Sequence, residues 1–563
     1  MALKSRWLWP TLCCAALLAA ILPAWPFDEA GFEDDWSYGH EALKLAQTGH
    51  LHHNGWGGSI LLVQSLWAAP WIRLFGFSFQ LLQVSTIPFS LGAVLLIYAV
   101  GRRVGLSRSL AAFASIGSAL SPLLLPFAAS FMTESCTCFF GMLCVYCAIR
   151  ASQAETSQEA RRWLWLLAAS ALTGGANRQI VWAAGFPLIL LIAWERRADS
   201  RVRLHALAAL AVAAASTLAI LHFFSPPYGA LRLGGTTLTA VALHRGGAAT
   251  VALLRLLLVV AAMVLPAFAC LFRRLDWRLL PISFVLTVAG IFVGAPLAPY
   301  GDNMVTPVGI AFGRQDVLGA AFVVLTPWTC LLLTMVVNVC VLNGLTGLRR
   351  CRRESTPAAR RALRILAVFS LAYLALLVPG AITDIIFDRY MAPLVPLLFL
   401  AVMMQAARAG SRPPVIGWAC LILISGYAVA TTHDHFEQLR AGLRTAHDLE
   451  HAGIGRSHIS AGMEYDGWTQ LYFTDHVRGV DYTDQFADNT AKGFWFEAWD
   501  HLPNVQPDYV VLNWIGADPP HGVAASAGFD AWLPPHRRTV VMWKRADLTA
   551  ELQAARILSE SLH

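Results

Sequence analysis

The hydrophobic positions of this chain gather into long, nearly uncharged runs. Runs of about 17 to 25 apolar residues match the length of helix that crosses the hydrocarbon core of a bilayer. They recur from the N-terminus to about residue 432, and shorter, more polar patterns follow. The thirteen predicted spans are residues 7–26, 81–100, 109–127, 132–150, 163–176, 178–194, 204–223, 250–272, 279–297, 318–344, 362–380, 389–407 and 414–432. The pattern predicts a polytopic α-helical membrane protein with about 13 transmembrane helices.

Composition leads to the same class. Of the 563 residues, 56% are hydrophobic and only 14% are charged, and the mean hydropathy is +0.54. A soluble protein of this length needs more charged residues to cover its surface. The composition therefore excludes an ordinary soluble enzyme and agrees with a chain that lies mostly in lipid.

The basic residues mark the predicted orientation. The loops on one side of the predicted spans hold 24 of the 42 Lys and Arg residues and six acidic residues. The tail after residue 432 holds ten basic and eighteen acidic residues. By the positive-inside rule, the N-terminus is predicted to be cytoplasmic and the tail extracytoplasmic. The net charge of +7 is the sum of basic loops on one side and an acidic tail on the other. It reflects orientation in the membrane, so no nucleic-acid partner is predicted.

Two domains follow from the pattern. Residues 1–432 are predicted to form the transmembrane catalytic domain, with its first outer loop at 27–80. That loop holds two stretches, 33–47 and 60–75, that are typical of interfacial helices. Residues 433–563, with strand-like runs after a helical pattern, predict a small extracytoplasmic α/β domain that is long enough for its own core.

The first span is interpreted as an uncleaved anchor, since cleavage would break the alternation of basic loops.

Cysteines and histidines do not predict a metal or disulfide site. Ten of the eleven cysteines fall within predicted spans and the tail has none, so no disulfide framework is indicated. His50, His52 and His53 form a short cluster. No fourth ligand with suitable spacing accompanies them. An ordinary loop is therefore the favoured interpretation, and a metal site is the less favoured alternative because Asp34 and Asp35 lie nearby.

Three consecutive carboxylates, Glu33, Asp34 and Asp35, stand at the head of an amphipathic stretch shortly after the first span. Charges at the edge of a bilayer are costly unless they are solvated, paired or used. One alternative is that these acids cap an interfacial helix. A cap needs one acid and three are present, so the cluster is a candidate site.

Four short motifs follow one another on the predicted outer side of the membrane. They are the acid pair Asp34 and Asp35 with Trp36 and Tyr38, FMTE at 131–134, NRQ at 177–179 and DRYMAPLVP at 388–396. In this order they resemble the GT-C membrane glycosyltransferases, in particular the protein O-mannosyltransferase and lipid A aminoarabinose transferase group of glycosyltransferases. The resemblance covers about residues 28–405, and it implies a GT-C fold for the membrane domain.

The resemblance implies an activity. Such enzymes move a sugar from a polyprenyl-phosphate donor, with inversion, to an acceptor hydroxyl of a glycan, lipid or protein on the outer face of the bacterial inner membrane. The expected enzyme is therefore a hexosyl- or pentosyltransferase. A polyprenyl phosphate is already a good leaving group, so one base and some cations suffice, unlike the two carboxylates of a glycosidase. No cofactor is required for this chemistry.

The resemblance also implies roles for the acids. The base is expected to be Asp34, four residues before Tyr38, with Asp35 as its rival. A helix N-terminus favours the ionised carboxylate that a base needs. Glu134, where many relatives have aspartate, is expected to orient the acceptor or to pair with an arginine. As an alternative, Thr133 and Glu134 only cap their helix.

Arginines are the candidate ligands of the donor phosphate. Arg178 lies in the NRQ turn, where a cation beside free backbone N–H groups suits a phosphate. Arg389 takes the corresponding place at a later span, although Asp388 adjoins it as a possible counter-charge. Arg314, in the outer segment 298–317, is a third candidate. Structural ion pairs are the alternative for each.

Two other functions compete with the transferase. A transporter or flippase of a lipid-linked sugar also needs ionisable groups, but transporters usually show repeated halves and charges near the midplane. Here the halves do not match, and the candidate charges lie at the outer edge. A polysaccharide polymerase or ligase also uses outer arginines. The acid pair directly after the first span favours the transferase.

Overall fold

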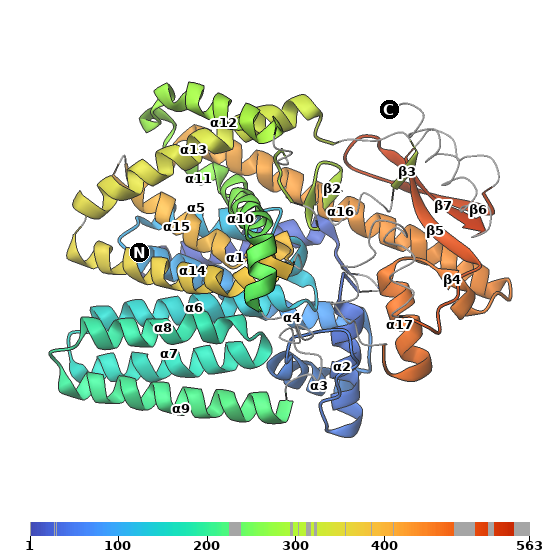
Figure 1. Ribbon diagram of the computed structural model, residues 1–563, viewed down its shortest axis with the longest axis horizontal. Helices are drawn as coiled ribbons and strands as arrows, with labels where there is room; N and C mark the ends of the chain where they lie inside the picture. The colour runs from blue at the N-terminus through green and yellow to red at the C-terminus, as the bar shows by residue number, and fades with distance from the viewer. Residues whose placement is uncertain are drawn as a thin grey trace.

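A computed structural model describes the protein at residues 2–27, 29, 31–224, 238–292, 297–301, 303–310, 317–319, 324–354, 356–383, 386–408, 410–477, 502–515 and 523–544. Helices dominate it, and many lie roughly parallel in a bundle (Figure 1). A sheet and one short helix lie at one end of this bundle, beyond α2.

The helices account for most of the described chain. They are α1 (Ala2–Ala24), α2 (Asp35–Thr48), α3 (Leu62–Phe75), α4 (Phe79–Arg103), α5 (Arg108–Ala119), α6 (Thr133–Gln153), α7 (Ser157–Asn177), α8 (Ile180–Glu195), α9 (Ser200–Phe224), α10 (Leu238–Met263), α11 (Leu265–Ala269), α12 (Leu280–Phe292), α13 (Pro327–Glu354), α14 (Pro357–Thr383), α15 (Leu394–Ala406), α16 (Val415–His451) and α17 (Met463–Thr474). Short 3-10 turns include η1 (Pro126–Ala129) and η5 (Asp388–Met391).

The predicted membrane class is confirmed. Among the described residues, seven helices are long and apolar enough to cross a bilayer, and four shorter apolar helices accompany them. Each of the thirteen predicted spans overlaps a helix. The number thirteen itself stays a prediction, because several of these helices are too short to cross by themselves.

The predicted span at 109–127 is wrong in its second half. Helix α5 ends at Ala119, and the chain then runs through Pro122 and Pro126 to the start of α6. Proline has no N–H for a helical hydrogen bond, so the helix does not continue. Residues 120–132 are nevertheless buried throughout. Non-helical backbone at membrane depth is tolerated where it is buried in protein and does not contact lipid.

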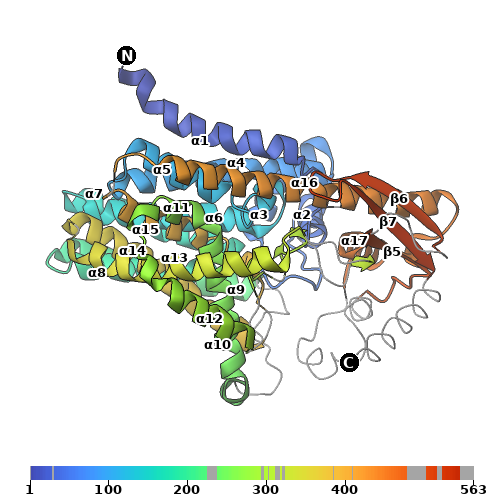
Figure 2. The same cartoon turned by 90° about the horizontal axis from the view of Figure 1, so that it is seen from above.

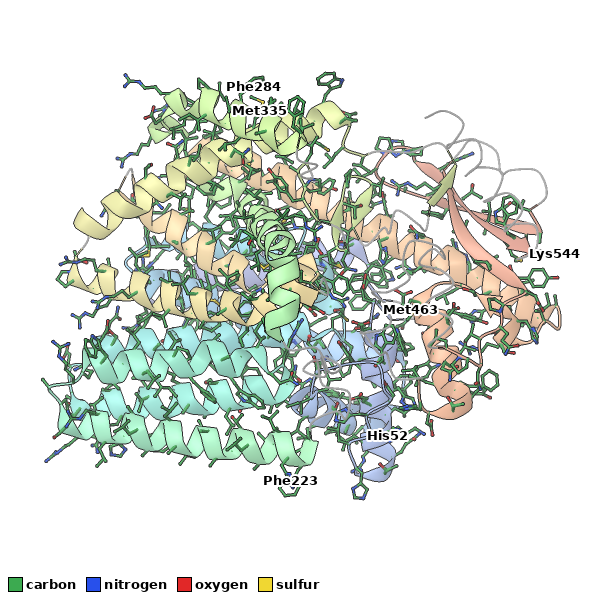
Figure 3. All side chains as sticks on the ribbon, viewed as in Figure 1. His52, Phe223, Phe284, Met335, Met463 and Lys544 are labelled. Carbon is green, nitrogen blue, oxygen red and sulfur yellow. The ribbon has the colours of Figure 1, made fainter. Side chains whose placement is uncertain are left out.

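Apolar side chains cover the outside of the bundle. Phe223 on α9 and Phe284 on α12 lie at opposite edges and point outward (Figure 3). They are 73% and 54% exposed. In water such surfaces promote aggregation, whereas in a bilayer they face lipid.

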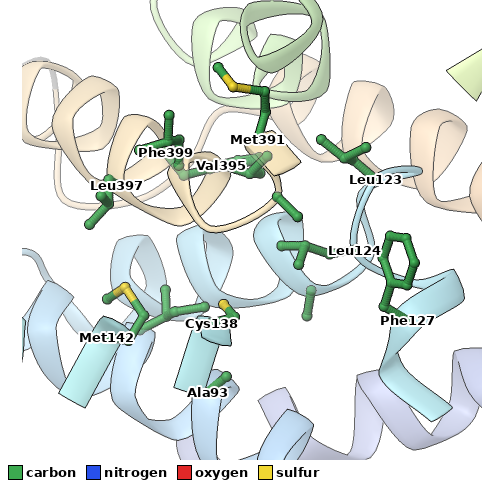
Figure 4. Close-up of a cluster of buried hydrophobic side chains, with 14 of the residues drawn as sticks. Ala93, Leu123, Leu124, Phe127, Cys138, Met142, Met391, Val395, Leu397 and Phe399 are labelled. Carbon is green, nitrogen blue, oxygen red and sulfur yellow. The ribbon is translucent and has the colours of Figure 1, made fainter. Parts of the chain in front are cut away.

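The inside of the bundle is packed around α4, α6 and α15. Met391, Val395 and Phe399 lie on one side of the interior, and Leu124 and Phe127 lie opposite them (Figure 4). All five are nearly or fully buried. The turn η5, which precedes α15, thus borders this buried interior and also contacts α10.

Helices α2 and α3 lie between α1 and α4, in the loop predicted to be the first outer one, close to the predicted stretches. Helix α2 ends at Gly49, whose positive φ of 77° is the left-handed conformation that glycine adopts without strain. Trp36 and Ala42 on this helix are completely buried, and its placement at the membrane interface stays a prediction. Helix α17 of the tail packs against it, and a Cβ on Gly467 would overlap the ring of Trp36.

A sheet combines four described strands of the tail with one strand, β3, from the segment before α13. They are β3 (Val317–Gly319), β4 (Ile459–Ser460), β5 (Tyr509–Ile515), β6 (Ala525–Asp530) and β7 (Arg537–Lys544), in the order β3-β5-β7-β6, with β4 also paired to β5. β3 and β4 run parallel to β5, whereas β7 is antiparallel to both β5 and β6. A separate two-stranded ladder joins β1 (Val305–Thr306) to β2 (Gly309–Ile310).

Helix α16 crosses the predicted boundary at 432/433 without a break. It runs for 37 residues from the bundle to the sheet (Figure 2). Its outer half packs on the sheet, where Ala441 contacts a cluster of strand residues including Val511 and Val540. The tail is therefore attached to the membrane part by a continuous helix, and the predicted division into two domains stays a prediction.

Candidate active site

Asp34 stands at the N-cap of α2, but within the described part of the chain its side chain makes no cap hydrogen bond. Its two oxygens are used elsewhere. The indole Nε1 of Trp56 donates to Oδ1 at 2.7 Å, and Nη2 of Arg389 donates to Oδ2 at 2.8 Å. The carboxylate is held by a neutral donor and a cation, so the alternative that it merely caps a helix does not describe its contacts.

Arg389 joins the first outer loop to the turn before α15. Its Nη1 donates to Oε2 of Glu33 at 2.8 Å, so each edge of the guanidinium holds a different carboxylate. Asp388 is not the counter-charge that the sequence offered, because its two oxygens accept the backbone N–H groups of Met304 and Val305, each at 2.8 Å. Burial opposes the charge of Arg389, but the neighbouring carboxylates outweigh it and keep its pKa well above the usual value.

Glu134 and Arg178 form a second ion pair. Glu134 is almost completely buried in the first turn of α6, and Nη1 of Arg178 donates to its Oε1 at 2.7 Å. The same nitrogen donates to Oγ1 of Thr133 at 2.9 Å. Arg178 lies in the turn between α7 and α8. Of the three roles suggested by the sequence for Glu134, pairing with an arginine is the one that the structure contains.

Two tyrosines connect these ion pairs. The guanidinium carbons of Arg178 and Arg389 lie 4.8 Å and 5.8 Å from the ring centre of Tyr390, within cation–π range. Tyr38 on α2 is buried, which raises the pKa of its phenol, and Asp34 adds to this effect while Arg389 opposes it. The two ion pairs therefore share one site at the end of the bundle.

Asp35 occupies a different environment. It is fully buried, and its Oδ2 accepts the backbone N–H groups of Phe32 at 3.2 Å and Phe131 at 3.0 Å. Its Oδ1 has no hydrogen-bond partner among the described residues. Burial raises the pKa of Asp35 well above its usual value, against these two hydrogen bonds. Asp35 thus ties the first loop to the turn before α6, whereas Asp34 is the acid of the pair that contacts Arg389.

Asp35→Asn is expected to leave folding and transfer close to wild type. A carboxyl whose pKa is raised in the folded state costs stability as pH rises above its unfolded value, and an amide of the same shape avoids that cost while one oxygen still accepts both N–H groups. Thermal unfolding in detergent and a transfer assay measure this. A loss of transfer with normal unfolding would make Asp35, not Asp34, the base.

The structure also limits the other candidates. Arg314 lies outside the described residues. Among the residues that the structure describes, no group of three or more His, Cys, Asp or Glu side chains is placed to hold a metal ion. In the histidine cluster, His53 lies 3.1 Å from the buried carboxylate of Glu41, so it has a structural partner.

Sequence reasoning missed the role of three side chains at the site. Glu33 had been grouped with the acids but not assigned, and it is the second partner of Arg389. Trp56 comes from the glycine-rich stretch after the histidines and holds Asp34. Tyr390 adjoins Arg389 in the DRYM motif and faces both arginines. The motif itself was the available signal for Tyr390, whereas no spacing along the chain pointed to Trp56.

The helical membrane fold, with carboxylates set against arginines at one end of the bundle, has the arrangement that the resemblance to the GT-C membrane glycosyltransferases predicted. Residues 7–224 match the family model described as dolichyl-phosphate-mannose-protein mannosyltransferase. The match covers less than half of the chain, and it includes Asp34, Glu134 and Arg178. It agrees with the predicted resemblance to the GT-C superfamily, and it spans three of the four motifs.

Solved structures are similar at low identity. ArnT from Cupriavidus metallidurans in the apo state is 12% identical over 96% of this chain and 98% of that chain, with a TM-score of 0.39. The same protein bound to undecaprenyl phosphate is 12% identical over 95% and 98%, with a TM-score of 0.38. The oligosaccharyltransferase of Archaeoglobus fulgidus is 13% identical over 91% of this chain and 70% of that chain, with a TM-score of 0.42. No curated protein matches the chain in sequence.

Proposed function

We propose that this protein is an inverting glycosyltransferase that moves a sugar from a polyprenyl-phosphate donor to an acceptor hydroxyl on the outer face of the bacterial inner membrane. One observation supports this most directly. The carboxylate of Asp34 is 2.8 Å from Arg389, and Tyr390 places Arg178 beside the same site. A base and two cations, which this reaction needs, are therefore available together.

In the proposed reaction Asp34 accepts the proton of the acceptor hydroxyl. The acceptor oxygen forms a bond to the anomeric carbon of the sugar while the bond from that carbon to the phosphate oxygen breaks. The electron pair leaves with the polyprenyl phosphate, whose charge Arg178 and Arg389 stabilise. Trp56 holds the other oxygen of Asp34 at 2.7 Å and so orients the base.

The surroundings of Asp34 suit a base. Its side chain is only 14% exposed, so competition from water is reduced. The proton that it accepts is the only one that the step moves, because the phosphate needs no protonation to leave. The proposed chemistry thus requires no cofactor, and the acceptor remains of a broad class: glycan, lipid or protein.

The test compares the envelope glycolipids and glycoproteins of three strains by mass spectrometry: parent, deletion strain, and deletion strain that expresses Asp34→Asn. The expected result is one class of glycosylated molecule that disappears in the deletion strain and is not restored by the variant, although wild type restores it. In the deletion strain the transferase predicts that the unused lipid-linked sugar accumulates on the outer face. If glycosylation is lost and the lipid-linked sugar instead accumulates on the cytoplasmic face, the flippase alternative replaces the transferase.

A further inference from the structure

The guanidinium of Arg389 is shared between two carboxylates. Nη1 takes Glu33 and Nη2 takes Asp34, each at 2.8 Å. Arginine commonly uses this pair of edges to hold two oxygens of one phosphate or carboxylate group. The proposed reaction uses Asp34 but has no role for Glu33. The second carboxylate therefore needs its own explanation.

The backbone of Glu33 is held in an unusual conformation. Its φ is +54°, in the left-handed region that residues other than glycine seldom occupy. Its N–H donates to Oε1 of Glu464, on α17 of the tail, at 3.2 Å. The tail thus helps to fix the residue that directs a carboxylate at Arg389. Uncommon backbone conformations of this kind are found at functional sites.

The carboxyl group of Glu33 carries its charge at a cost. Burial raises its pKa to about 7, Arg389 opposes this, and Asp34 and Asp388 add to it. A hydrogen bond to the side chain of Asn303 favours the charged form. From α17, Glu464 brings a further carboxylate to the backbone N–H of Glu33. The guanidinium of Arg389 thus faces the carboxyl group of Glu33, and three other acids, Asp34, Asp388 and Glu464, lie around Glu33.

We propose that Glu33 is a placeholder for the donor phosphate: its carboxylate occupies the edge of Arg389 that a phosphate oxygen takes, and it leaves that edge when the lipid phosphate binds. This inference rests on the proposed function and adds to it a residue that sets donor affinity. Asp34 keeps the other edge, so the base stays in position while the phosphate enters beside it.

The exchange of Glu33 for the donor phosphate is accompanied by uptake of a proton. A phosphate beside Arg389 brings new negative charge next to Glu33, and like charges favour protonation of a carboxylate. Glu33 therefore takes a proton from solvent as the phosphate binds. Above about pH 7 Glu33 is charged in the free protein, so this uptake makes donor affinity fall as pH rises. Below that pH the group is already neutral and the dependence disappears.

The test measures binding of undecaprenyl phosphate to the full-length protein in detergent or nanodiscs, from about pH 6 to about pH 9. Glu33→Gln is expected to bind at least about fivefold more tightly than wild type at alkaline pH, with a flatter pH dependence. The phosphate itself titrates near pH 6, so the difference between variant and wild type isolates Glu33. Glu33→Asn is the second variant, because asparagine tolerates a positive φ.

Two controls separate the possible failures. Asp475→Asn removes a half-exposed carboxylate that pairs with Lys44 on α2, and it is expected to leave donor binding unchanged. Arg389→Ala is expected to lose donor binding. If wild type binds, Arg389→Ala does not, and both Glu33 variants keep the affinity and pH dependence of wild type, the placeholder is overturned while the proposed function stands. If wild type does not bind undecaprenyl phosphate at all, both proposals fall.

Discussion

Asp34→Asn is expected to reduce sugar transfer by about 10²- to 10⁴-fold, the range that a positioned general base contributes. The amide can still accept the hydrogen bond from Trp56, but it cannot take the acceptor's proton. Transfer in reconstituted vesicles, with undecaprenyl phosphate release as the readout, measures the loss.

Asp35→Asn is the matched control for this experiment, since it makes the same chemical change one residue away. Binding of undecaprenyl phosphate and thermal unfolding of Asp34→Asn are expected to remain near wild type. Transfer at the wild-type rate in Asp34→Asn would remove Asp34 as the base.

Arg178→Ala is expected to destabilise the protein by about 3 kcal/mol, because it leaves the charge of Glu134 buried without its partner. Glu134 is only 1% exposed, so water cannot replace the guanidinium. Donor binding is expected to weaken as well. Thermal unfolding in detergent and binding of undecaprenyl phosphate measure the two effects separately.

Glu134→Gln separates the two roles of Arg178. In the double variant Arg178→Ala with Glu134→Gln the buried charge is gone, so stability is expected to recover while donor binding stays weak. If donor binding recovers together with stability, Arg178 serves the fold alone and the phosphate role is wrong. If Arg178→Ala unfolds at the wild-type temperature, the ion pair does not stabilise the fold.

The sequence predicted the helices well for a physical reason. A helix that crosses lipid must be apolar over its whole length, and such runs are visible without any knowledge of packing. The same reasoning failed at 109–127, where the apolar run continues but Pro122 and Pro126 stop the helix. There the residues are apolar because protein covers them, and hydropathy does not distinguish that from contact with lipid.

The sequence predicted which residues belong to the site better than it predicted which of them form ion pairs with each other. Asp34, Glu134, Arg178 and Arg389 were all named from short motifs, and the structure brings them together. The partner of Arg389 was not predictable, since Asp388 is its neighbour in sequence while Glu33 is 356 positions away. Adjacent side chains point in different directions in the turn η5, so Asp388 turns to backbone N–H groups instead.

Trp56 shows a second limit of sequence reasoning. Its indole reaches Asp34 across 22 residues, through a loop that Asn54 fastens to α2 by a hydrogen bond from Nδ2 to the carbonyl oxygen of Ser37 at 2.8 Å. Such a loop has no periodic pattern, and its geometry depends on tertiary contacts.

The unbroken course of α16 makes bilayer thickness relevant to the site. A spanning helix adjusts its tilt when the hydrophobic thickness of the surrounding membrane changes. Since the same helix continues into the sheet, a change of tilt swings the sheet, and the connected α17 is pulled against α2. We therefore expect the contact between Glu464 and Glu33 to respond to lipid composition.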